Sequence, residues 1–554
     1  MFSLTTLNDE TQKNIQLIDF EKGNLSEEVL QQLPLQTLYF NLRQSTPEEV
    51  ALIFPKLLKS QKQALFDLDL WAKDDFDAKK FSFWLSAIDL CNSNSTKLDF
   101  VQTEEMVLFL KSEFTISTFD IDDPDYPDHE NFFITDDNLL KIEYNEDFNE
   151  SEELKRLIKL LYAEMGVENA YAYLFKIVNE SYMADAEELY QNKKSRLADL
   201  GFVDYFDSLD ILAPFNDVNF LNHYLKQNRE KNLTPNVASQ IFNQGVDVKI
   251  LNQYQKEVLE VEAELKKVVD VKRLRFLKVN FLKFINATLS FEANYKINNL
   301  QLTEINKKYS NILKLGLDFV KNKFPDDNIF MHFDFVDLCK AGKSLIYISQ
   351  KKLKSVVKNE EDTFIGSYFN DFVQDSFLSC VKFKDETVNN INVYQEWNRQ
   401  IEFFVKTSTI INKFKINFQN LVDQQMVANE YYVNYDLASI DFEALIITAF
   451  SNYLLEINDQ KMGLTLSELK KVLPLIMDQV TNKVFDFNNH DFNSKMDQFL
   501  QVFGLNESPL FKNYLREVLA AQMEGYDWKT LTPADYKHVG GPILLTAPDN
   551  LVYH

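Results

Sequence analysis

Glycine and proline are scarce in this chain, which has 12 glycines and 13 prolines among 554 residues. Each is present at about half its usual frequency or less. Both residues mark the turns between short strands, and both interrupt helices. No proline occurs between Pro235 and Pro325 or between Pro325 and Pro474. The sequence therefore predicts a mainly α fold, a multi-helix array for which a superhelical or repeat-like arrangement stays open.

Helix-start signals are clearest in the first ninety residues. In the segment TPEEV, Thr46 can accept a hydrogen bond from a free backbone N–H, Pro47 has a preset φ, and Glu49 can complete a capping box. A second start is expected at Ser26, and a third where Asp75 or Asp77 precedes an apolar run. These signals predict short helices joined by tight turns.

A small β insertion is expected at residues 113–147. The segment FTISTFDI is rich in β-branched and aromatic residues, and FFITDDNLLKIEY reads as two strands around a Thr-Asp-Asp-Asn turn. Between them lies an acidic loop that is punctuated by prolines, DDPDYPDHE. This insertion interrupts an otherwise helical chain.

Five regions are expected along the chain: an N-terminal helical region (1–112), the β insertion with its acidic loop (113–147), a second helical region that resembles the first (148–230), a long-helix bundle (231–460), and C-terminal helices with an extended tail (461–554). The resemblance between the first and second helical regions rests on helix pairs that begin near Leu38 and Leu161, which suggest a repeat.

Long helices are expected at residues 248–288, 296–323, 332–356, 386–420, 441–457 and 465–482. The apolar segment at 543–545 follows a Gly-Gly-Pro turn and is expected to dock on the body.

The chain is strongly acidic, with 84 Asp and Glu against 58 Lys and Arg and a formal charge of −26. Phosphate binding needs clustered Lys and Arg, so nucleic acid is excluded as a partner, and an anionic membrane surface is disfavoured. Acidity of this degree usually serves solubility, and a basic partner is the alternative. The partner that we expect is another protein.

The cysteines and the N-terminus indicate a cytoplasmic protein. Cys91, Cys339 and Cys380 are far apart and odd in number, which favours three buried thiols in a reducing compartment. The N-terminal segment carries acidic residues where a signal peptide needs a basic start and an apolar core. No run approaches eighteen apolar residues, and a lipid-anchor motif is absent.

The segment ALFDLDLWAKDDFDAKKFSFWL, residues 64–85, is the first candidate metal site because it contains five aspartates. A calcium loop needs a glycine at its sixth position and a bidentate Glu at its twelfth, and this segment has no glycine. A paired-carboxylate site at Asp67 and Asp69 stays open as an alternative. The interpretation that we favour is a helical corner, in which Asp75 or Asp77 caps the next helix. Asp67 and Asp69 would then bind neighbouring backbone or a lysine.

The acidic loop from Asp120 to Glu130 is the second candidate. It is denser in carboxylates and includes His129, so hard oxygen ligands could gather around a weakly bound divalent ion. Prolines at 124 and 127 interrupt the ligand spacing. A solvated acidic loop is the simpler interpretation.

Two fragments of catalytic motifs fail on inspection. Gly342-Lys343-Ser344 matches the end of a phosphate-binding loop, but Asp337 stands where the loop needs its first glycine and would repel phosphate. Gly366-Ser367 is followed by Tyr-Phe and so does not form a G-x-S-x-G elbow. The six histidines are dispersed. We therefore assign no catalytic, cofactor-binding or metal-binding residues and expect no cofactor.

Four segments, LPLQTLYFNL, DLDLWAKDDFDAKKFSFWL, LDFVQTEEMVLFLKSEFTIS and RLADLGFVDYFDSLDILAPF, together resemble a bacterial family catalogued as a domain of unknown function. The resemblance spans most of residues 26–215 and is looser around LCKAGKSLIYIS and in the C-terminal tail. It implies a helical, soluble protein and carries over no site residue. The rhythm of LP-x-x-x-LY and TPEEVALIFPKLLKSQ is also similar to the cytoplasmic superhelical N-domain of MgtE-type magnesium transporters, which implies shared architecture only.

Three functional hypotheses follow from these observations. The first is a cytoplasmic helical scaffold or protein-interaction protein without catalytic activity, which presents a helical surface with acidic rims. The second is a divalent-cation-responsive regulator that uses the acidic segments 67–77 and 120–130. The third is a hydrolase whose site is assembled from distant residues.

Overall fold

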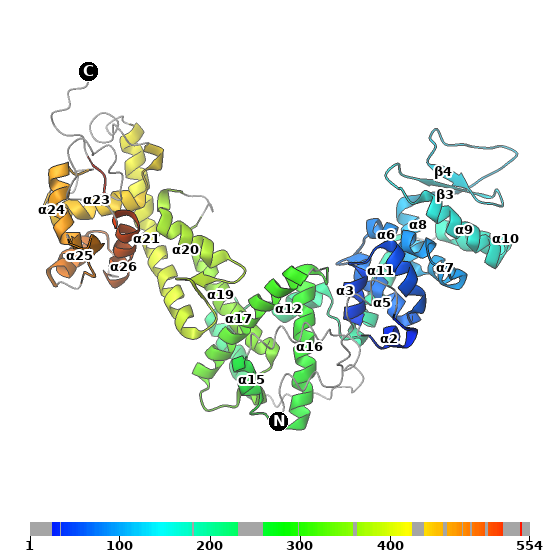
Figure 1. Ribbon diagram of the computed structural model, residues 1–554, viewed down its shortest axis with the longest axis horizontal. Helices are drawn as coiled ribbons and strands as arrows, with labels where there is room; N and C mark the ends of the chain where they lie inside the picture. Colours follow the sequence, from blue (N-terminus) through cyan, green and yellow to red (C-terminus); the bar gives the residue numbers. More distant parts are fainter. Residues whose placement is uncertain are drawn as a thin grey trace, which may run out of the picture. The chain divides into compact units, whose positions relative to one another are not determined.

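The computed structural model describes residues 25–33, 35–179, 182–230, 259–296, 299–357, 363–423, 437–457, 463–478, 480–487, 490–504, 508–524 and 543–545. These residues form 23 α-helices and four small antiparallel sheets (Figure 1). The prediction of a mainly α fold with a small β insertion is confirmed.

The chain forms two compact units. Unit 1 comprises residues 1–214 and 219–343, and unit 2 comprises residues 215–218 and 344–554. The helices described in unit 1 are α2 (Glu27–Gln32), α3 (Leu35–Leu42), α4 (Pro47–Ile53), the 3-10 helix η2 (Phe54–Lys56), α5 (Lys59–Asp69), α6 (Ala78–Asp89), α7 (Asn94–Val101), α8 (Glu104–Glu113), α9 (Ser151–Met165), α10 (Val167–Asn179), α11 (Tyr182–Asp199), α12 (Tyr205–Leu212), α13 (Val218–Glu230), α15 (Leu259–Leu265), α16 (Val271–Ala293), α17 (Asn299–Lys323), α18 (Ile329–His332) and α19 (Phe335–Lys354), whose last residues belong to unit 2. The expected division into five regions stays a prediction.

Unit 2 consists of shorter helices around one very long helix. Its elements are η4 (Thr363–Ile365), α20 (Ser367–Phe377), β6 (Lys382–Phe383), β7 (Glu386–Thr387), α21 (Ile391–Asp423), η5 (Leu437–Ser439), α23 (Phe442–Leu454), α24 (Leu466–Ile476), β8 (Met477–Asp478), β9 (Lys483–Val484), α25 (His490–Val502) and α26 (Ser508–Met523). Four buried side chains that line part of its core are Phe418, Ile440, Leu445 and Leu544.

The helix-start signals have the expected geometry. Thr46 Oγ1 accepts from the N–H of Glu49 at 3.4 Å, and the Glu49 carboxylate accepts from the N–H of Thr46 at 2.8 Å. Ser26 caps α2 through the N–H of Val29. Because these bonds form within one turn, the local sequence is enough to predict them.

Aromatic side chains fill the core beside α5, α6 and α8. Phe81 stacks on Phe109 with ring centroids 4.3 Å apart, and Phe66 meets Trp84 edge to face at 5.1 Å. All four side chains are buried. Phe81 and Trp84 therefore have the core role that the sequence indicated.

The β insertion is a three-stranded antiparallel sheet in the order β3-β5-β4, built from β3 (Phe114–Thr118), β4 (Phe132–Ile134) and β5 (Leu140–Tyr144). Figure 1 shows β3 and β4 close to α8 and α9. The Thr-Asp-Asp-Asn turn joins β4 to β5, and Asn138 has the positive φ of 57° that such a tight turn requires. The positions of all three strands agree with the prediction.

The long helices follow the sequence pattern with three corrections. The expected helix at 248–288 is interrupted, because α15 ends at Leu265 and Asp270 caps a new helix by accepting from the N–H groups of Lys272 and Arg273. Residues 248–258 lie outside the described residues. The helix expected from 386 begins only at Ile391, and the helix expected to reach 482 ends at Ile476. In both places a short hairpin replaces part of the helix.

Among the described residues, a helix followed by a hairpin of two-residue strands and a second helix occurs three times. The hairpins are β1 (Trp71–Ala72) with β2 (Asp75–Phe76), β6 with β7, and β8 with β9. In each, the residue after the second strand donates its N–H to the carbonyl before the first strand; the pairs are Asp77 to Leu70 (2.8 Å), Val388 to Val381 (2.9 Å) and Phe485 to Ile476 (3.0 Å). The helix pairs near Leu38 and Leu161 are also present, as α3–α4 and α9–α10.

The apolar tail docks on unit 2 as expected. Leu545 forms a parallel bridge with Leu464, and the N–H of Leu464 donates to the carbonyl of Leu544 at 2.9 Å. The side chains of residues 543–545 are buried. The Gly-Gly-Pro turn that precedes them lies outside the described residues.

Within the part of the chain that the structure describes, none of the helices combines the length and the apolar character needed to cross a membrane.

Candidate functional site

Asp67, the first aspartate of the candidate metal segment, is bound by an arginine. Asp67 lies on α5, and its side chain is fully buried. Arg196 of α11 donates two hydrogen bonds to its carboxylate, from Nε to Oδ2 at 2.9 Å and from Nη2 to Oδ1 at 2.7 Å. Such a two-point contact is the strongest arrangement for this pair. The Arg196 Nη2 also lies 4.0 Å from the carboxylate of Glu105.

Asp69 is held by a different set of donors. Trp84 donates its indole N–H to Oδ2 at 2.9 Å, and the Tyr39 hydroxyl donates to Oδ1 at 3.4 Å. Arg43 Nε lies 3.8 Å from the same carboxylate. The prediction that Asp67 and Asp69 bind neighbouring backbone or a lysine is therefore wrong, because their side-chain partners are arginine, indole and phenol groups of other helices and the Gln63 amide of the same helix.

The two aspartates expected to cap α6, Asp75 and Asp77, do less than the sequence indicated. Asp75 lies in β2, and Asp77 occupies the N-cap position of α6 but makes no side-chain hydrogen bond there. Instead, the Asp77 carboxylate pairs with Lys80 at 3.0 Å. The prediction of a side-chain cap at Asp75 or Asp77 is wrong, although the helix begins where expected.

Trp71 anchors this corner to α16. Its carbonyl accepts from the Asn294 side chain at 3.1 Å and from Lys296 Nζ at 2.7 Å. Lys193 Nζ lies 5.0 Å from the indole centroid. Burial, reinforced by Lys80, lowers the pKa of Lys296 to about 7, and burial lowers the pKa of Lys193 to about 8. The helical-corner interpretation thus describes a contact in which the Trp71 carbonyl and Lys296 are bound within the protein, whereas the buried Trp71 indole N–H has no hydrogen-bond partner among the described residues.

The acidic loop is exposed and is tied to the sheet by one lysine. The buried Lys141 of β5 donates to the carbonyl of Asp125 at 3.0 Å and pairs with Glu143 at 3.1 Å. His129 Nε2 lies 3.6 Å from the same Glu143 carboxylate. Among the described residues, no group of three or more His, Cys, Asp or Glu side chains is arranged to hold a metal ion.

Gly342 serves helix packing. It lies within α19, where a Cβ would overlap the carbonyl oxygen of Ile312, and a Cβ on Gly316 of α17 would likewise overlap that of Leu338. Asp337 belongs to a capping pair at the start of α19, in which it and Asp334 each accept from the other's N–H at 3.0 Å. The Gly-Lys-Ser triplet therefore lies within the continuous helix α19, and its glycine allows α19 to pack closely against α17.

Gly366 and Ser367 begin α20, and a carboxylate from α23 covers them. Glu443 accepts from the N–H of Tyr368 at 2.7 Å and from the Ser367 hydroxyl at 3.2 Å. Burial, reinforced by Asp441, raises the pKa of Glu443 to about 7.

The three cysteines differ in burial. Cys91 and Cys339 are buried as expected, whereas Cys380 is only partly buried, which corrects the expectation of three buried thiols.

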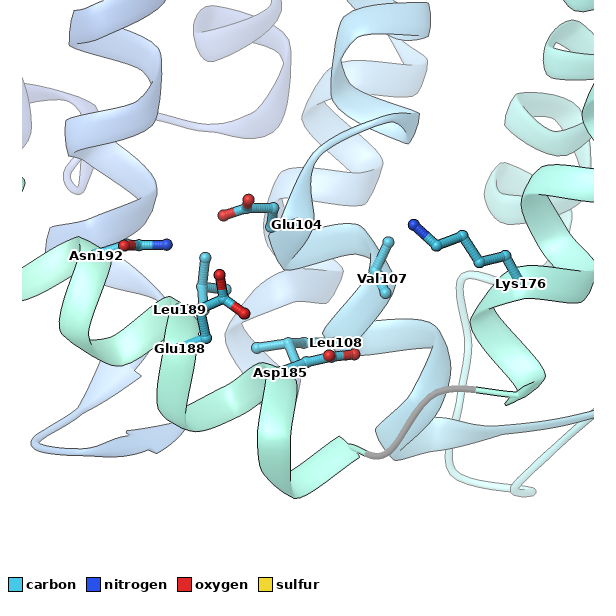
Figure 2. Close-up of a pocket in the computed structure, with 8 residues that line it drawn as sticks. All are labelled: Glu104, Val107, Leu108, Lys176, Asp185, Glu188, Leu189 and Asn192. Carbon is cyan, nitrogen blue, oxygen red and sulfur yellow. The ribbon is translucent and has the colours of Figure 1, made fainter.

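A cleft that no sequence motif predicted lies between α8, α10 and α11 in unit 1. It encloses about 320 Å³ and is lined by Glu104, Val107, Leu108, Lys176, Asp185, Glu188, Leu189 and Asn192. Figure 2 shows Lys176 extending from α10 toward Val107, with the α11 residues facing α8 from the other side. We refer to this set of residues as the α8–α11 cleft.

The cleft has an acidic rim and a small apolar floor, and most of its exposed lining is polar. Leu108 and Leu189 are buried, while Glu104 and Glu188 are exposed. Asp185 forms an ion pair with Lys111 of α8. Because Glu104 and Glu188 outnumber the single lining cation, Lys176, the rim favours a cationic group whose aliphatic part rests on the floor.

Beside the cleft, α8 and α11 carry a buried charge cluster. Glu105 follows Glu104 on α8 but points into the core, where its Oε1 accepts from Gln63 and faces Arg196. Burial, together with the nearby Asp67, raises the pKa of Glu105 to about 7. The inner faces of α8 and α11 are thus joined through a group that titrates near neutrality.

Sequence reasoning missed the cleft because α8 is separated from α10 and α11 by a long stretch of chain that includes the β insertion and α9. The available signal was limited to the i, i+3, i+4 and i+7 spacing of Asp185, Glu188, Leu189 and Asn192 on one helix face. That pattern alone also describes an ordinary solvated face.

A family model described as a family of unknown function (DUF6178) matches residues 13–544 of the chain. No curated protein matches, and no solved structure matches.

Proposed function

Since the chain belongs to the family of unknown function DUF6178, whose model covers it almost from end to end, we propose its function from the chemistry of the α8–α11 cleft. The protein acts in the cytoplasm as a helical interaction protein without catalytic activity, and the cleft receives a basic side chain of a partner protein. The observation that carries this proposal is the pairing of an apolar floor with an acidic rim in one cavity.

The dimensions and charge of the cleft support a lysine or arginine side chain as the group received. A volume of about 320 Å³ lies at the lower end of the range of ligand pockets, about 300–1,000 Å³. The methylene stem of such a side chain can cover Val107, Leu108 and Leu189 while its head reaches Glu104 and Glu188. The formal charge of −26 would also speed encounter with a basic partner.

Site-specific photocrosslinking in the native host tests the proposal. A photoreactive residue at Asn192, inside the cleft, should capture a protein through a segment rich in Lys or Arg, and one at the exposed Asn322 of α17 should not. The E104Q/E188Q variant should lose the Asn192 crosslink, because it removes the rim charges. Equal capture at both positions, or capture that the E104Q/E188Q variant keeps, would contradict the proposal.

We also propose two finer relationships. A bacterial origin is supported by the likeness of residues 26–215 to a bacterial family, and an architecture shared with the N-domain of MgtE-type transporters is supported by the rhythm of LP-x-x-x-LY and TPEEVALIFPKLLKSQ. A calcium or magnesium titration followed by calorimetry tests the divalent-cation alternative, and a heat of binding below about millimolar concentration would favour it over the basic-segment proposal.

A further inference from the structure

Glu105 is a buried carboxyl group beside the α8–α11 cleft. It is fully buried and directly follows Glu104, a residue of the rim, on α8. Its Oε1 accepts from the Gln63 amide, while its Oε2 is buried and has no hydrogen-bond partner among the described residues. A carboxylate in such surroundings is poorly stabilised, because burial disfavours the charged form and one oxygen stays unpaired.

Arg196 connects Glu105 to the cleft. It follows the lining residue Asn192 by four positions, so the two side chains point to the same side of α11. Its Nη2 lies 4.0 Å from Oε1 of Glu105. Figure 2 shows Asn192 and Glu104 on the side of the cleft away from Lys176. Glu105 and Arg196 therefore adjoin the end of the cleft at which Glu104 lies.

The charge of this cluster depends on one proton. The Asp67 carboxylate accepts two hydrogen bonds from the guanidinium and raises the pKa of Arg196. The charges of Glu105 and Glu104 raise it further, so Arg196 stays a cation and Asp67 balances it. The cluster of Asp67, Arg196 and Glu105 thus has no net charge when Glu105 is protonated and one negative charge when Glu105 is ionised.

Glu105 changes its charge near neutral pH. Burial, together with the charge of Asp67 on α5, raises the pKa of Glu105 to about 7, although Gln63 of α5 and Arg196 of α11 oppose this shift. A group with a pKa of about 7 is mostly protonated at pH 6 and mostly ionised at pH 8. The additional negative charge beside the cleft is therefore largely absent at pH 6 and largely present at pH 8.

We propose that Glu105 is a proton switch for the α8–α11 cleft, which binds a cationic group weakly while Glu105 is protonated and more tightly once Glu105 is ionised. This inference rests on the proposed function, since it concerns the same cation in the same cleft. It adds the regulation of that site by pH. Because coupling between two binding events is reciprocal, a cation that binds in the cleft also releases a proton from Glu105.

Isothermal titration calorimetry with the full chain tests the inference. The probe is tetralysine with both ends blocked, whose side chains stay charged between pH 6 and pH 8 because the pKa of lysine is about 10.4. The affinity of the wild type should rise about threefold to tenfold over this range, since one negative charge is added near the bound ammonium group. Titrations at pH 7 in two buffers with different heats of ionisation should show a release of protons on binding.

E105Q should abolish both effects, because glutamine does not ionise. Its affinity should be the same at pH 6 and pH 8 and close to that of the wild type at pH 6. The matched control is E443Q, which removes a carboxyl group of unit 2 whose pKa burial also raises to about 7. E443Q should keep the pH dependence and the proton release. A melting temperature of E105Q no lower than that of the wild type shows that unfolding is not the cause.

E104Q/E188Q tests the proposed function separately and should lose most of its affinity for tetralysine at both pH values. If it does so while the wild type binds equally well at pH 6 and pH 8, the proton switch is wrong and the proposed function stands. Full affinity in E104Q/E188Q would overturn both. A pH dependence that E105Q keeps, or that E443Q loses, would belong to another group and would overturn the inference.

Discussion

Arg196 and Asp67 form a two-point ion pair across 129 positions of sequence, with distances of 2.9 and 2.7 Å. Asp67 is fully buried, whereas the arginine side chain is 34% exposed. The pair joins α5 to α11, and Arg196 lies four residues after Asn192, on the same side of α11 as the residues that line the cleft. It therefore links the packing of the core to the position of one wall of the cleft.

Removing Arg196 should destabilise unit 1 strongly. R196A leaves the buried Asp67 carboxylate without its cation, and such losses typically cost about 3–5 kcal/mol. The partial exposure of the arginine places the expected value near the lower limit. Denaturant unfolding of the variant measures it.

R156A is the matched control for this prediction. Arg156 makes a similar contact to Asp89 at 2.7 Å, but it is 52% exposed, so its loss should cost less than about 1 kcal/mol. If the two variants lost equal stability, the buried pair would not have the role described here.

Glu105 should make the stability of unit 1 depend on pH. Burial, reinforced by Asp67, raises its folded-state pKa from 4.5 to about 7. The folded protein thus holds this proton more tightly than the unfolded chain does. The stabilisation is complete below about pH 4.5, declines as the pH rises toward 7, and is absent above that value.

E105Q removes this proton linkage. Relative to the wild type, the variant should gain about 2–3 kcal/mol in free energy of unfolding between pH 5 and pH 8. Paired denaturant titrations at several pH values measure the difference. Because the other buried carboxylates are present in both proteins, their contributions cancel, and a difference that stays constant with pH would refute the assignment to Glu105.

The contact between α17 and α19 should not tolerate a methyl group. G316A and G342A each place a Cβ against a backbone carbonyl of the facing helix, and overpacking of this kind costs about 1–3 kcal/mol. The double variant should cost less than the sum, because the first methyl group already separates the helices. N322A, at an exposed position of α17, should stay within about 0.5 kcal/mol of the wild type.

Glu443 and Gly366 should be energetically coupled. Gly366 has a φ of 89°, and a Cβ there would overlap the Glu443 side chain. E443A should cost unit 2 about 1–2 kcal/mol through loss of the contacts that cap α20. G366A should cost more in the wild type than in the E443A background, because only the backbone strain remains once the glutamate is shortened. A double-mutant cycle measures the coupling, and strictly additive costs would show that the two residues act independently.

The fold was predictable where its signals are local. The capping box at Thr46 and the strands of residues 113–147 appear where the sequence places them, because turn chemistry and alternation act over a few residues. The break near Asp270 was missed because the apolar pattern continues on both sides of it. The short hairpins were missed because their turns use Lys73, Lys384 and Asn482 at positive φ, where the expected signal is glycine.

The candidate sites were less predictable from the sequence than the fold was. The sequence rejected a calcium loop in residues 64–85 and a phosphate loop at Gly342 for reasons of spacing, and the structure shows what those residues do instead. It did not indicate the α8–α11 cleft, whose walls come from three helices. Spacing along one chain can exclude a motif, but it cannot show which helix faces will meet.

The sequence by itself determined the helical character of this protein, the place of its β insertion and its acidity, because composition and local hydrogen bonding decide these properties. Only the tertiary structure decided that Asp67 meets Arg196, that Gly342 meets Ile312, and that Glu104 and Glu188 share one cleft. These pairings depend on how apolar faces pack over long sequence separations, and that packing leaves no short-range signal in the chain.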